Sequence, residues 1–491
     1  MQILNYFLMK HIGIIGAGIS GLTTAKTFLQ KGYQVTVLEK SDGIGGVWHQ
    51  SRSYVGVTTQ TTRDEYAFSD YPMPSHYPMW PTGQQVQEYL TNYAIHFGIM
   101  PHIQFGITVK NMYYDGFNWM VKLGDGRSLS FAYVVVCTGT FHEPYIPEIP
   151  GMDSFKNAGG LLLHSSNLSS TEQLAGKDVA IIGFAKSATD IAATAADVSK
   201  RCTLIYRRAQ WKVPRFFGNR INMKYLLFSR FSEAFFDAHK KNTFQYVLHS
   251  LGRPFVWLHW RMLELLLKKQ FNLKKCNMLP THRIEDQISC SLGVEPVQFY
   301  KKVAAKQIQG ICSEIAHFNG RDMVLKNGEV MRPDLVVFGT GFKQRLPFLQ
   351  LQYQEMITNA NGMYTLYRNI LHPDLPQMGF VGFNSSLFTT LTSEIAAHWL
   401  AATVSGDLIL PPAEDMLREM RLMEKWRCEE RPIAAEFSGL CVAPFNYKHL
   451  DELMRDMGYR TRASRNFIYE FFKPINPKDY KKMLSGKSVI F

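Results

Sequence analysis

The stretch IGIIGAGISG, residues 12–21, decides the fold of the first part of this chain. A short apolar strand ends there in a glycine turn, and a helical pattern follows to about Gly32. Gly16 permits the tight turn, Gly18 lets the backbone approach a pyrophosphate, and Gly21 lets the helix pack closely on the strand. The N–H groups at the start of this helix favour phosphate. The stretch therefore predicts a dinucleotide site.

The residues after this turn indicate which dinucleotide binds. A second strand is expected over residues 34–39, and it ends in Glu39. A carboxylate there accepts hydrogen bonds from ribose hydroxyls and repels a 2′-phosphate. The glycine-rich run 43–48 then lets the chain lie close to a cofactor, which favours FAD over NAD. The alternatives are an ordinary loop for this run and a glycine turn without a ligand for residues 16–21. The expected FAD contacts in this part of the chain are Gly16, Gly18, Ser20, Gly21, Glu39, Gly46, Val47 and Trp48.

A second unit of the same kind lies near the middle of the chain. Residues 178–182 predict a strand, an alanine-rich helix follows, and residues 202–206 predict the next strand. The turn 183–188 lacks the two later glycines, and the second strand ends in an Arg pair instead of an acid. Arginine pairs bidentately with a 2′-phosphate, so we expect NADPH, and the alternative is a structural unit with a surface Arg pair. The expected contacts are Gly183, Ala185, Lys186, Ser187, Ala188, Arg207 and Arg208.

Two further apolar strands end in glycine turns. Residues 133–137 precede Thr138 and Gly139, and residues 335–338 precede a turn that ends in Gly341. In a protein with two dinucleotide folds, these strands would return the chain to each sheet. We therefore add Thr138, Gly139 and Gly341 to the expected cofactor contacts.

Composition limits the function classes. The 491 residues carry a formal charge of +13, with 46% hydrophobic and 19% charged residues, which excludes a disordered chain. No nucleic-acid motif and no uninterrupted apolar run of ~18 residues occurs. The seven cysteines form no CxxC, so we expect reduced thiols in a cytoplasmic compartment, with neither disulfides nor a metal site. The first residues do not resemble a secretory signal, and either Met1 or Met9 is the start.

The segment from about 216 to 276 is aromatic, basic and helical in pattern. Three readings remain open for it: it covers a substrate channel, it touches a membrane surface peripherally, or it is a helical insertion packed on the core.

At this point the chain resembles the flavin-containing monooxygenases, particularly their plant-type branch. The ordered set of motifs covers most of the chain and is more specific than any single member. Besides the two glycine turns, the matching stretches are Gly45–Trp48, Phe68–Pro72, Phe338–Phe342, Tyr367–Asn369, His372–Pro373 and Arg455–Gly458.

The resemblance implies a chemistry. NADPH reduces FAD, reduced flavin adds O₂ at carbon 4a to give a hydroperoxide, and a soft nucleophile takes the distal oxygen. The substrate would be a small molecule oxygenated at nitrogen or sulfur. By the same resemblance, Gln60 stands beside the flavin where the animal branch has an Asn, and its carboxamide can donate to a flavin oxygen. Gln60 is therefore the catalytic candidate, and a polar loop residue is the alternative.

Three positions depart from the family pattern. Gly160 and His164 keep the central spacing of the linker fingerprint, but Ala158 and Leu168 stand where aromatic residues are expected. Ala185 replaces a glycine in the second turn. These departures put the coupling of NADPH binding to flavin chemistry in question, and His164 reads better as a hydrogen-bonding linker residue than as a catalyst.

We predict an α/β protein with two Rossmann-like domains, the NADPH domain being inserted into the FAD domain. The FAD domain would comprise residues 1–168 and 331–491, and the NADPH domain residues 169–330, with a helical insertion at about 216–290. The expected function is NADPH-dependent oxygenation of nitrogen or sulfur in a small molecule. Two alternatives stay open: a Baeyer–Villiger or oxidative-decarboxylating monooxygenase, and a non-oxygenating FAD protein that acts as an NADPH oxidase or a scaffold.

Overall fold

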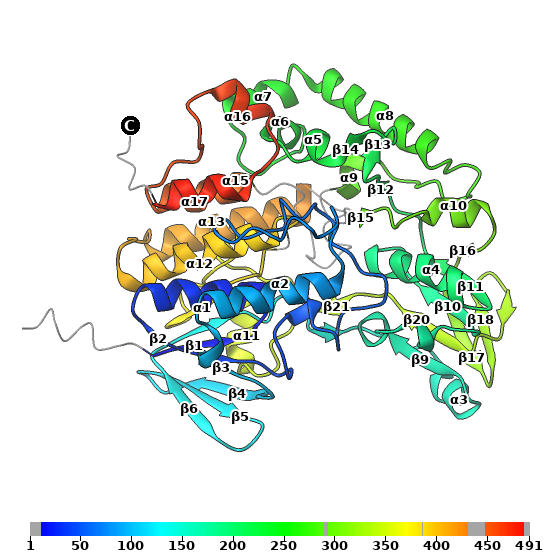
Figure 1. Ribbon diagram of the computed structural model, residues 1–491, viewed down its shortest axis with the longest axis horizontal. Helices are drawn as coiled ribbons and strands as arrows, with labels where there is room; N and C mark the ends of the chain where they lie inside the picture. The colour runs from blue at the N-terminus through cyan, green and yellow to red at the C-terminus, as the bar shows by residue number, and fades with distance from the viewer. Residues whose placement is uncertain (1–10, 289–292, 385, 431–446, 486–491) are drawn as a thin grey trace, which may run out of the picture. The chain divides into compact units, whose positions relative to one another are not determined.

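The computed structural model describes residues 11–288, 293–384, 386–430 and 447–485 (Figure 1). The choice between Met1 and Met9 as the start lies outside these residues. The chain forms two compact units. Unit 1 comprises residues 1–49, 61–142 and 344–491, and unit 2 comprises residues 50–60 and 143–343.

Unit 1 is built on a five-stranded parallel sheet with the strand order β22-β7-β1-β2-β3. The predicted strands are present, because short apolar runs that are buried on both faces suit a parallel sheet. β1 and β2 pair in register from His11 opposite Gln34 to Ile15 opposite Leu38. The strands are β1 (His11–Ile15), β2 (Gln34–Leu38), β3 (Ile103–Gln104), β7 (Tyr133–Val136) and β22 (Met378–Phe380).

Two helices of unit 1 pack on each other beside this sheet. Helix α1 (Ile19–Gln30) starts directly after the first glycine turn and packs against α12 (Thr389–Ser405). Both helices are buried along most of their length, which explains their many small and apolar residues. The other helices of unit 1 are α2 (Gly83–His96), α11 (Leu351–Ile357), α13 (Ala413–Lys425), α15 (Tyr447–Asp456), α16 (Phe467–Phe472) and α17 (Pro477–Ser485).

Unit 2 repeats the architecture. Its five-stranded parallel sheet has the order β16-β11-β10-β20-β9. Helix α4 (Lys186–Val198) follows the second glycine turn as predicted. The strands are β9 (Leu161–His164), β10 (Asp178–Ile182), β11 (Arg201–Tyr206), β16 (Gln309–Cys312) and β20 (Leu335–Phe338). The two sheets confirm the predicted α/β class with two Rossmann-like folds.

Each unit places a three-stranded antiparallel sheet just before the strand that returns to the parallel sheet. In unit 1 it precedes β7, and in unit 2 it precedes β20. The prediction that residues 133–137 and 335–338 return the chain to each sheet is therefore confirmed. These small sheets comprise β4 (Val109–Tyr114), β5 (Trp119–Leu123) and β6 (Ser128–Phe131) in unit 1, and β17 (Ile315–Asn319), β18 (Asp322–Leu325) and β19 (Val330–Met331) in unit 2.

The boundaries of the units differ from the predicted domain limits. The limits at 168 and 330 both fall inside unit 2. The reason is strand pairing, because β9 lies before residue 168 and β20 lies after residue 330, yet the two strands pair with each other. A short antiparallel pair, β8 (Glu143–Pro144) with β21 (Phe342–Lys343), closes unit 2 at both ends of its main segment.

The aromatic segment of unit 2 is helical after a short hairpin, β13 (Phe216–Phe217) and β14 (Ile221–Asn222), which the sequence did not predict. Further elements of unit 2 are α3 (Met152–Asn157), β12 (Lys212–Val213), α5 (Met223–Leu227), α6 (Arg230–Ala234), α7 (Thr243–His249), α8 (Arg253–Gln270), α9 (Ile284–Ile288), β15 (Gly293–Val294) and α10 (Phe299–Ala304). Among the described residues, no helix has the length and apolar character needed to cross a membrane.

Candidate cofactor-binding sites

The first glycine turn of unit 1 has a geometry that only glycine permits. Gly16 has φ +106°, and a Cβ there would lie 2.9 Å from the backbone oxygen of Cys137 on the neighbouring strand. A Cβ on Gly21 would lie 1.8 Å from the oxygen of Gly16. Side chains are thus excluded from both positions, and the first turn of α1 begins tight against the end of β1. The first N–H groups of α1 have no partner within the helix, as at any helix start.

Glu39 is buried at the end of β2, next to this turn. Its Oε2 accepts a hydrogen bond of 2.7 Å from the N–H of Ala17, and its Oε1 accepts one of 2.8 Å from the N–H of Ser41. The structure therefore brings the predicted acid and the predicted glycine turn together. Each carboxylate oxygen keeps a second lone pair for a ribose hydroxyl.

The other predicted FAD residues surround the same turn. The glycine-rich run passes over it, because Gly46 Cα would lie 3.5 Å from a Cβ on Gly18. The indole Nε1 of Trp48 donates to the hydroxyl of Tyr66 at 3.0 Å, while Val47 is exposed. Ser20 Oγ lies 3.0 Å from Ser393 Oγ on α12. Thr138 and Gly139 follow β7, the strand beside β1.

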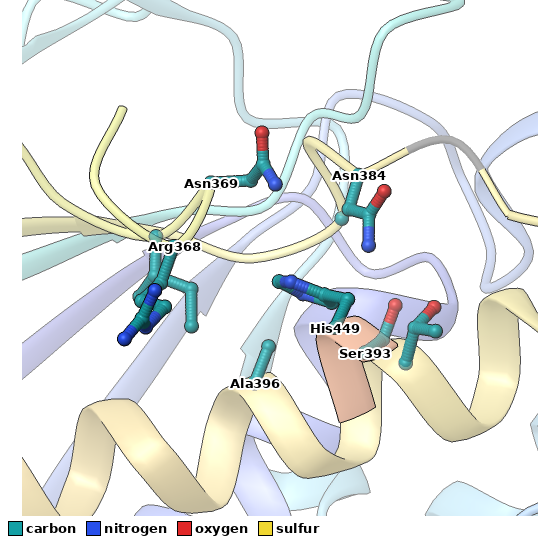
Figure 2. A pocket seen from close by; sticks show the side chains of 9 residues that line it. Arg368, Asn369, Asn384, Ser393, Ala396 and His449 are labelled. Atoms are coloured by element: carbon teal, nitrogen blue, oxygen red, sulfur yellow. The ribbon is translucent and has the colours of Figure 1, made fainter. Parts of the chain in front are cut away.

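A pocket lies in unit 1 between α12 and the loop that follows β22, and Figure 2 shows Asn384, Ser393, Ala396 and His449 around it. Among the described residues, no hydrogen-bond partner is available to the buried Nδ2 of Asn384. Burial, with the charge of Arg368 opposing protonation, lowers the pKa of His449 to about 3. The pocket therefore offers a neutral imidazole and an unused amide donor, a lining that fits a polar, uncharged or anionic group.

Two of the matching family motifs hold unit 1 together. In the motif Phe68–Pro72, Asp70 Oδ2 pairs with the buried Lys26 Nζ of α1 at 2.5 Å, and Ser69 donates to Glu394 of α12 through its N–H and its hydroxyl, both at 2.8 Å. In the motif Tyr367–Asn369, Arg368 Nε pairs with Asp456 at 2.8 Å. These contacts tie the helices to the loops.

The second glycine turn, in unit 2, also depends on glycine. Gly183 has φ +119°, and a Cβ there would lie 2.6 Å from the oxygen of Gly339. Ala185 is the N-cap of α4, so Lys186, Ser187 and Ala188 form the first turn of that helix. Despite its two missing glycines, the turn carries its helix away from the carboxyl end of β10 as in the first unit.

Lys186 is partly neutralised inside unit 2. Its Nζ forms an ion pair with Asp190 one helical turn later, and Tyr54 donates to Asp190 Oδ2 at 2.9 Å. Burial lowers the pKa of Lys186, and Asp190 opposes this shift. Sequence reasoning expected Lys186 to offset the missing glycine with its charge, but part of that charge is taken up by Asp190.

Lys212 is a second cation beside the same turn, and sequence reasoning missed it. Its side chain is only 2% exposed, and its Nζ lies 5.5 Å from the ring centre of Phe184 in the turn. A Cβ on Gly293, its partner in β15, would lie 2.8 Å from that Nζ, so glycine makes room for the ammonium group. Burial lowers the pKa of Lys212 to about 7, with Asp190 acting in the opposite direction.

Arg215 adds a third cation. One of its Nη atoms donates to the hydroxyl of Thr58 at 2.8 Å, and its charge helps to lower the pKa of Lys186. A second acid that acts on Arg215 is Glu295, whose own pKa is raised to about 7 by burial, with Arg215 opposing the shift. Three cations are thus balanced by Asp190 and by Glu295, which is partly protonated near neutral pH. The cations are Lys186, Lys212 and Arg215. We call these three residues the basic cluster.

The Arg pair and the predicted catalytic residue are also placed in unit 2. Arg207 follows β11 and is 82% exposed, with Nε 3.7 Å from Glu314, and Arg208 is half-buried next to it. The Oε1 of Gln60 accepts a hydrogen bond of 3.2 Å from the N–H of Val294, which leaves its amide N–H groups to donate. Whether Gln60 acts on a flavin stays a prediction.

His164 is held on both sides by hydrogen bonds in unit 2. Its Nε2 lies 2.9 Å from the backbone oxygen of Gly341, and its Nδ1 lies 2.8 Å from Ser166 Oγ. Since a carbonyl only accepts, Nε2 carries the proton. Burial lowers the pKa of this histidine. The geometry is that of a neutral linker residue, and Gly341, an expected cofactor contact, uses its carbonyl to hold it.

The basic cluster, together with Asp190 and Tyr54, comes from three separate segments, which is why the sequence did not reveal it. Asp190 and Lys186 lie one turn apart on α4, but Tyr54 lies far upstream, and Lys212 and Arg215 follow β11. The only available signal was a pair of basic residues six and nine positions after Tyr206.

Two parallel sheets, each with a glycine turn that leads into a helix, place the chain among the proteins with two dinucleotide-binding folds. The flavin-binding monooxygenase-like family matches residues 9–464, and the chain belongs to this family. It is therefore a flavin-dependent monooxygenase, an oxidoreductase, and its flavin is FAD.

Individual relatives agree with this assignment. The chain is 29% identical to a protein of Arabidopsis thaliana named probable flavin-containing monooxygenase 1, with 96% of each chain covered. Among solved structures it resembles S-allyl-L-cysteine S-oxygenase from Allium sativum (TM-score 0.63, 20% identity, 98% and 95% covered). It also resembles cyclohexanone monooxygenase from Rhodococcus sp. Phi1 bound to NADP⁺ (TM-score 0.62, 19% identity, 81% and 84% covered). These two likenesses show the fold.

Proposed function

We propose that this monooxygenase uses NADPH and O₂ to oxygenate a nitrogen or sulfur atom of a small molecule. The observation that carries the NADPH part is the basic cluster beside the second glycine turn, because buried positive charge at a helix start suits a phosphorylated ligand. The sulfur or nitrogen outcome is supported by the likeness to an S-oxygenase and by the motifs of the flavin-containing monooxygenases.

The first turn of unit 1 would hold FAD. Its N–H groups at the start of α1 would receive the pyrophosphate, and the free lone pairs of Glu39 would receive ribose hydroxyls. Asn384, with its unused buried amide donor, would contact a polar atom of the same cofactor. When bound, FAD supplies the electron transfer and the reaction with O₂, and the protein supplies binding, orientation and exclusion of water.

The second turn would hold NADPH. The first N–H groups of α4 and the basic cluster would receive phosphate oxygens, and Arg208 with Arg207 would lie near a 2′-phosphate at the end of β11. Arg207 would have to leave Glu314 to do so, at small cost because that pair is exposed. Asp190 holds Lys186 in place and limits the excess of positive charge before the ligand arrives.

Gln60 would act as an amide donor. Its Oε1 accepts a hydrogen bond from the N–H of Val294, and this bond orients the side chain. The NH₂ group is then left to donate to another acceptor. Fixed donors stabilise developing negative charge without reorganisation, which is the role proposed for Gln60.

A Baeyer–Villiger reaction is the second candidate, since cyclohexanone monooxygenase shares the fold. Product analysis separates the candidates. We would incubate the FAD-loaded enzyme with NADPH and O₂ and offer a thioether, a tertiary amine and a cyclic ketone separately. The proposal predicts sulfoxide or N-oxide in amounts equal to the NADPH consumed. Ester or lactone from the ketone alone would contradict it in favour of the second candidate, and peroxide release with every substrate would contradict both.

A cytoplasmic location, with peripheral contact to a membrane, is also a proposal. The membrane contact is supported by an exposed apolar and basic surface on unit 2.

A further inference from the structure

Helix α8 of unit 2 exposes an apolar face. On α8, Phe255, Leu258, Met262 and Leu265 follow one another at intervals of three or four and therefore share one face, and Leu251 lies just before the helix. These five side chains are between 49% and 85% exposed. In contrast, Glu264 on the opposite face is buried, where its Oε1 accepts a hydrogen bond of 3.1 Å from the N–H of Ile284. The same buried face also carries Val256, Trp260 and Leu267, so α8 is apolar on both faces, whereas an ordinary surface helix is polar on its exposed face.

The exposed apolar face extends over neighbouring elements of the same unit. Trp257 and Leu266 flank the stripe on α8, and α7 packs against α8. Figure 1 shows α8 with α5, α9 and the β13–β14 hairpin on one side of it. The apolar surface, as we use the term below, consists of Leu251, Phe255, Trp257, Leu258, Met262, Leu265 and Leu266 on and before α8, with Phe244, Tyr246 and Val247 on α7.

The segment that carries this surface is strongly basic. Residues 220–275 contain eleven Lys or Arg residues and only three Asp or Glu residues, so this short segment accounts for most of the formal charge of +13. Lys269 lies at the end of the stripe, and Lys274 and Lys275 follow α8, all three exposed. Arg253 is exposed at its start. Positive charges therefore stand at both ends of the apolar stripe.

We propose that the apolar surface docks unit 2 onto an anionic lipid bilayer, with α8 lying in the plane of the interface. Helices that lie in this position carry large apolar side chains on one face and Lys or Arg beside it. The basic side chains would meet anionic headgroups while Phe255, Leu258 and Met262 enter the boundary with the acyl chains.

Charge argues against a second copy of the chain as the occupant. Two such surfaces that met face to face would bring two strongly basic segments together, and like charges in contact disfavour association. An anionic bilayer meets both requirements of the surface at once, because it accepts apolar side chains and attracts cations.

The test measures co-sedimentation of the FAD-loaded full chain with vesicles of neutral phosphatidylcholine, alone or with about one third phosphatidylserine. The first variant carries Leu258→Gln, Met262→Gln and Leu265→Gln, three exposed positions where the change leaves the core intact. Its matched control carries Phe117→Gln and Ile409→Gln, two apolar residues of unit 1 that are at least as exposed. A third variant reverses charge at Lys269, Lys274 and Lys275 to Glu.

We expect the native enzyme to partition at least about tenfold more strongly onto the anionic vesicles than onto the neutral ones. The glutamine variant and the charge-reversal variant should each lose about tenfold or more of this binding, while the control binds like the native enzyme. Unchanged circular dichroism and FAD content show that each variant is folded.

Three results would overturn the proposal. The first is no binding of the native enzyme to anionic vesicles. The second is binding that survives in the glutamine variant. The third is a native dimer in sedimentation velocity that the glutamine variant converts to monomer without any vesicle binding, which would make a second copy the occupant.

Discussion

Replacing Lys212 with methionine should stabilise the protein near neutral pH while weakening its affinity for NADP⁺. Methionine has a similar length and no charge, so the change removes the ammonium group from a site that is 2% exposed. Asp190, whose negative charge raises the pKa of Lys212, keeps its contacts with Lys186 and Tyr54. The variant therefore leaves no acid without a partner.

The magnitude follows from the pKa of Lys212, which burial lowers from 10.5 to about 7 in the folded protein. Between these two values the unfolded chain binds more protons than the folded one, so the free energy of unfolding rises with pH across this window. At about 1.4 kcal/mol per pH unit, the buried charge destabilises the native fold by roughly 4 kcal/mol at pH 7 and by only about 1 kcal/mol at pH 9.5. Lys212→Met should remove this penalty and the pH slope with it.

The assay is urea unfolding of the enzyme, with the midpoints of native and variant compared at pH 7 and at pH 9.5. The variant midpoint should be higher at pH 7, and the difference should shrink towards pH 9.5. Lys200→Met is the matched control, because that side chain lies in the same unit and is 69% exposed. A variant that is less stable than native at pH 7, or a difference that does not change with pH, would refute the reasoning.

Binding provides the second readout for Lys212. Equilibrium dialysis should show NADP⁺ binding weakened about tenfold or more in Lys212→Met, because a buried charge partner of a phosphate is lost. Native binding should also take up a proton above pH 7, since an anion restores the charged form, and calorimetry in buffers of different ionisation enthalpy detects that proton. Equal affinity of the native enzyme and the Lys212→Met variant for NADP⁺ would show that Lys212 is not part of the nucleotide site.

Further predictions concern the two turns and Gln60. Gly18→Ala should lower FAD content without changing the unfolding midpoint of the FAD-free protein, because the added Cβ lies 3.5 Å from its nearest neighbour. Gly21→Ala should lower both the FAD content and the unfolding midpoint, because its Cβ would lie 1.8 Å from the oxygen of Gly16. Retention of FAD by Gly18→Ala would contradict the assignment of this turn to FAD. Arg208→Ala should raise KM for NADPH about tenfold and leave KM for NADH unchanged, and a parallel change in both would argue against a 2′-phosphate contact. Gln60→Ala should release more peroxide per NADPH consumed than the native enzyme. Gln60→Glu should do the same, because a carboxylate still accepts from the N–H of Val294 but has no amide donor. Native peroxide release in the Glu variant would mean that Gln60 contributes only its hydrogen bond with Val294.

Much of the parallel-sheet framework could be predicted from the sequence. The strand, glycine turn and helix around residues 12–30 and 178–198 are local features, set by apolar runs and by turns that exclude a Cβ. The β13–β14 hairpin was not predicted, because each of its strands has two residues and such short runs carry no readable period.

The sequence by itself determined that this chain carries two dinucleotide folds and resembles the flavin-containing monooxygenases, because each fingerprint lies within a few dozen consecutive residues. Only the tertiary structure decided the rest. It joined Lys186, Lys212 and Arg215 into one basic cluster from separate segments of the chain. It also left one of the two apolar faces of α8 exposed. A periodic pattern shows that a helix has an apolar face, but only packing determines whether that face is covered.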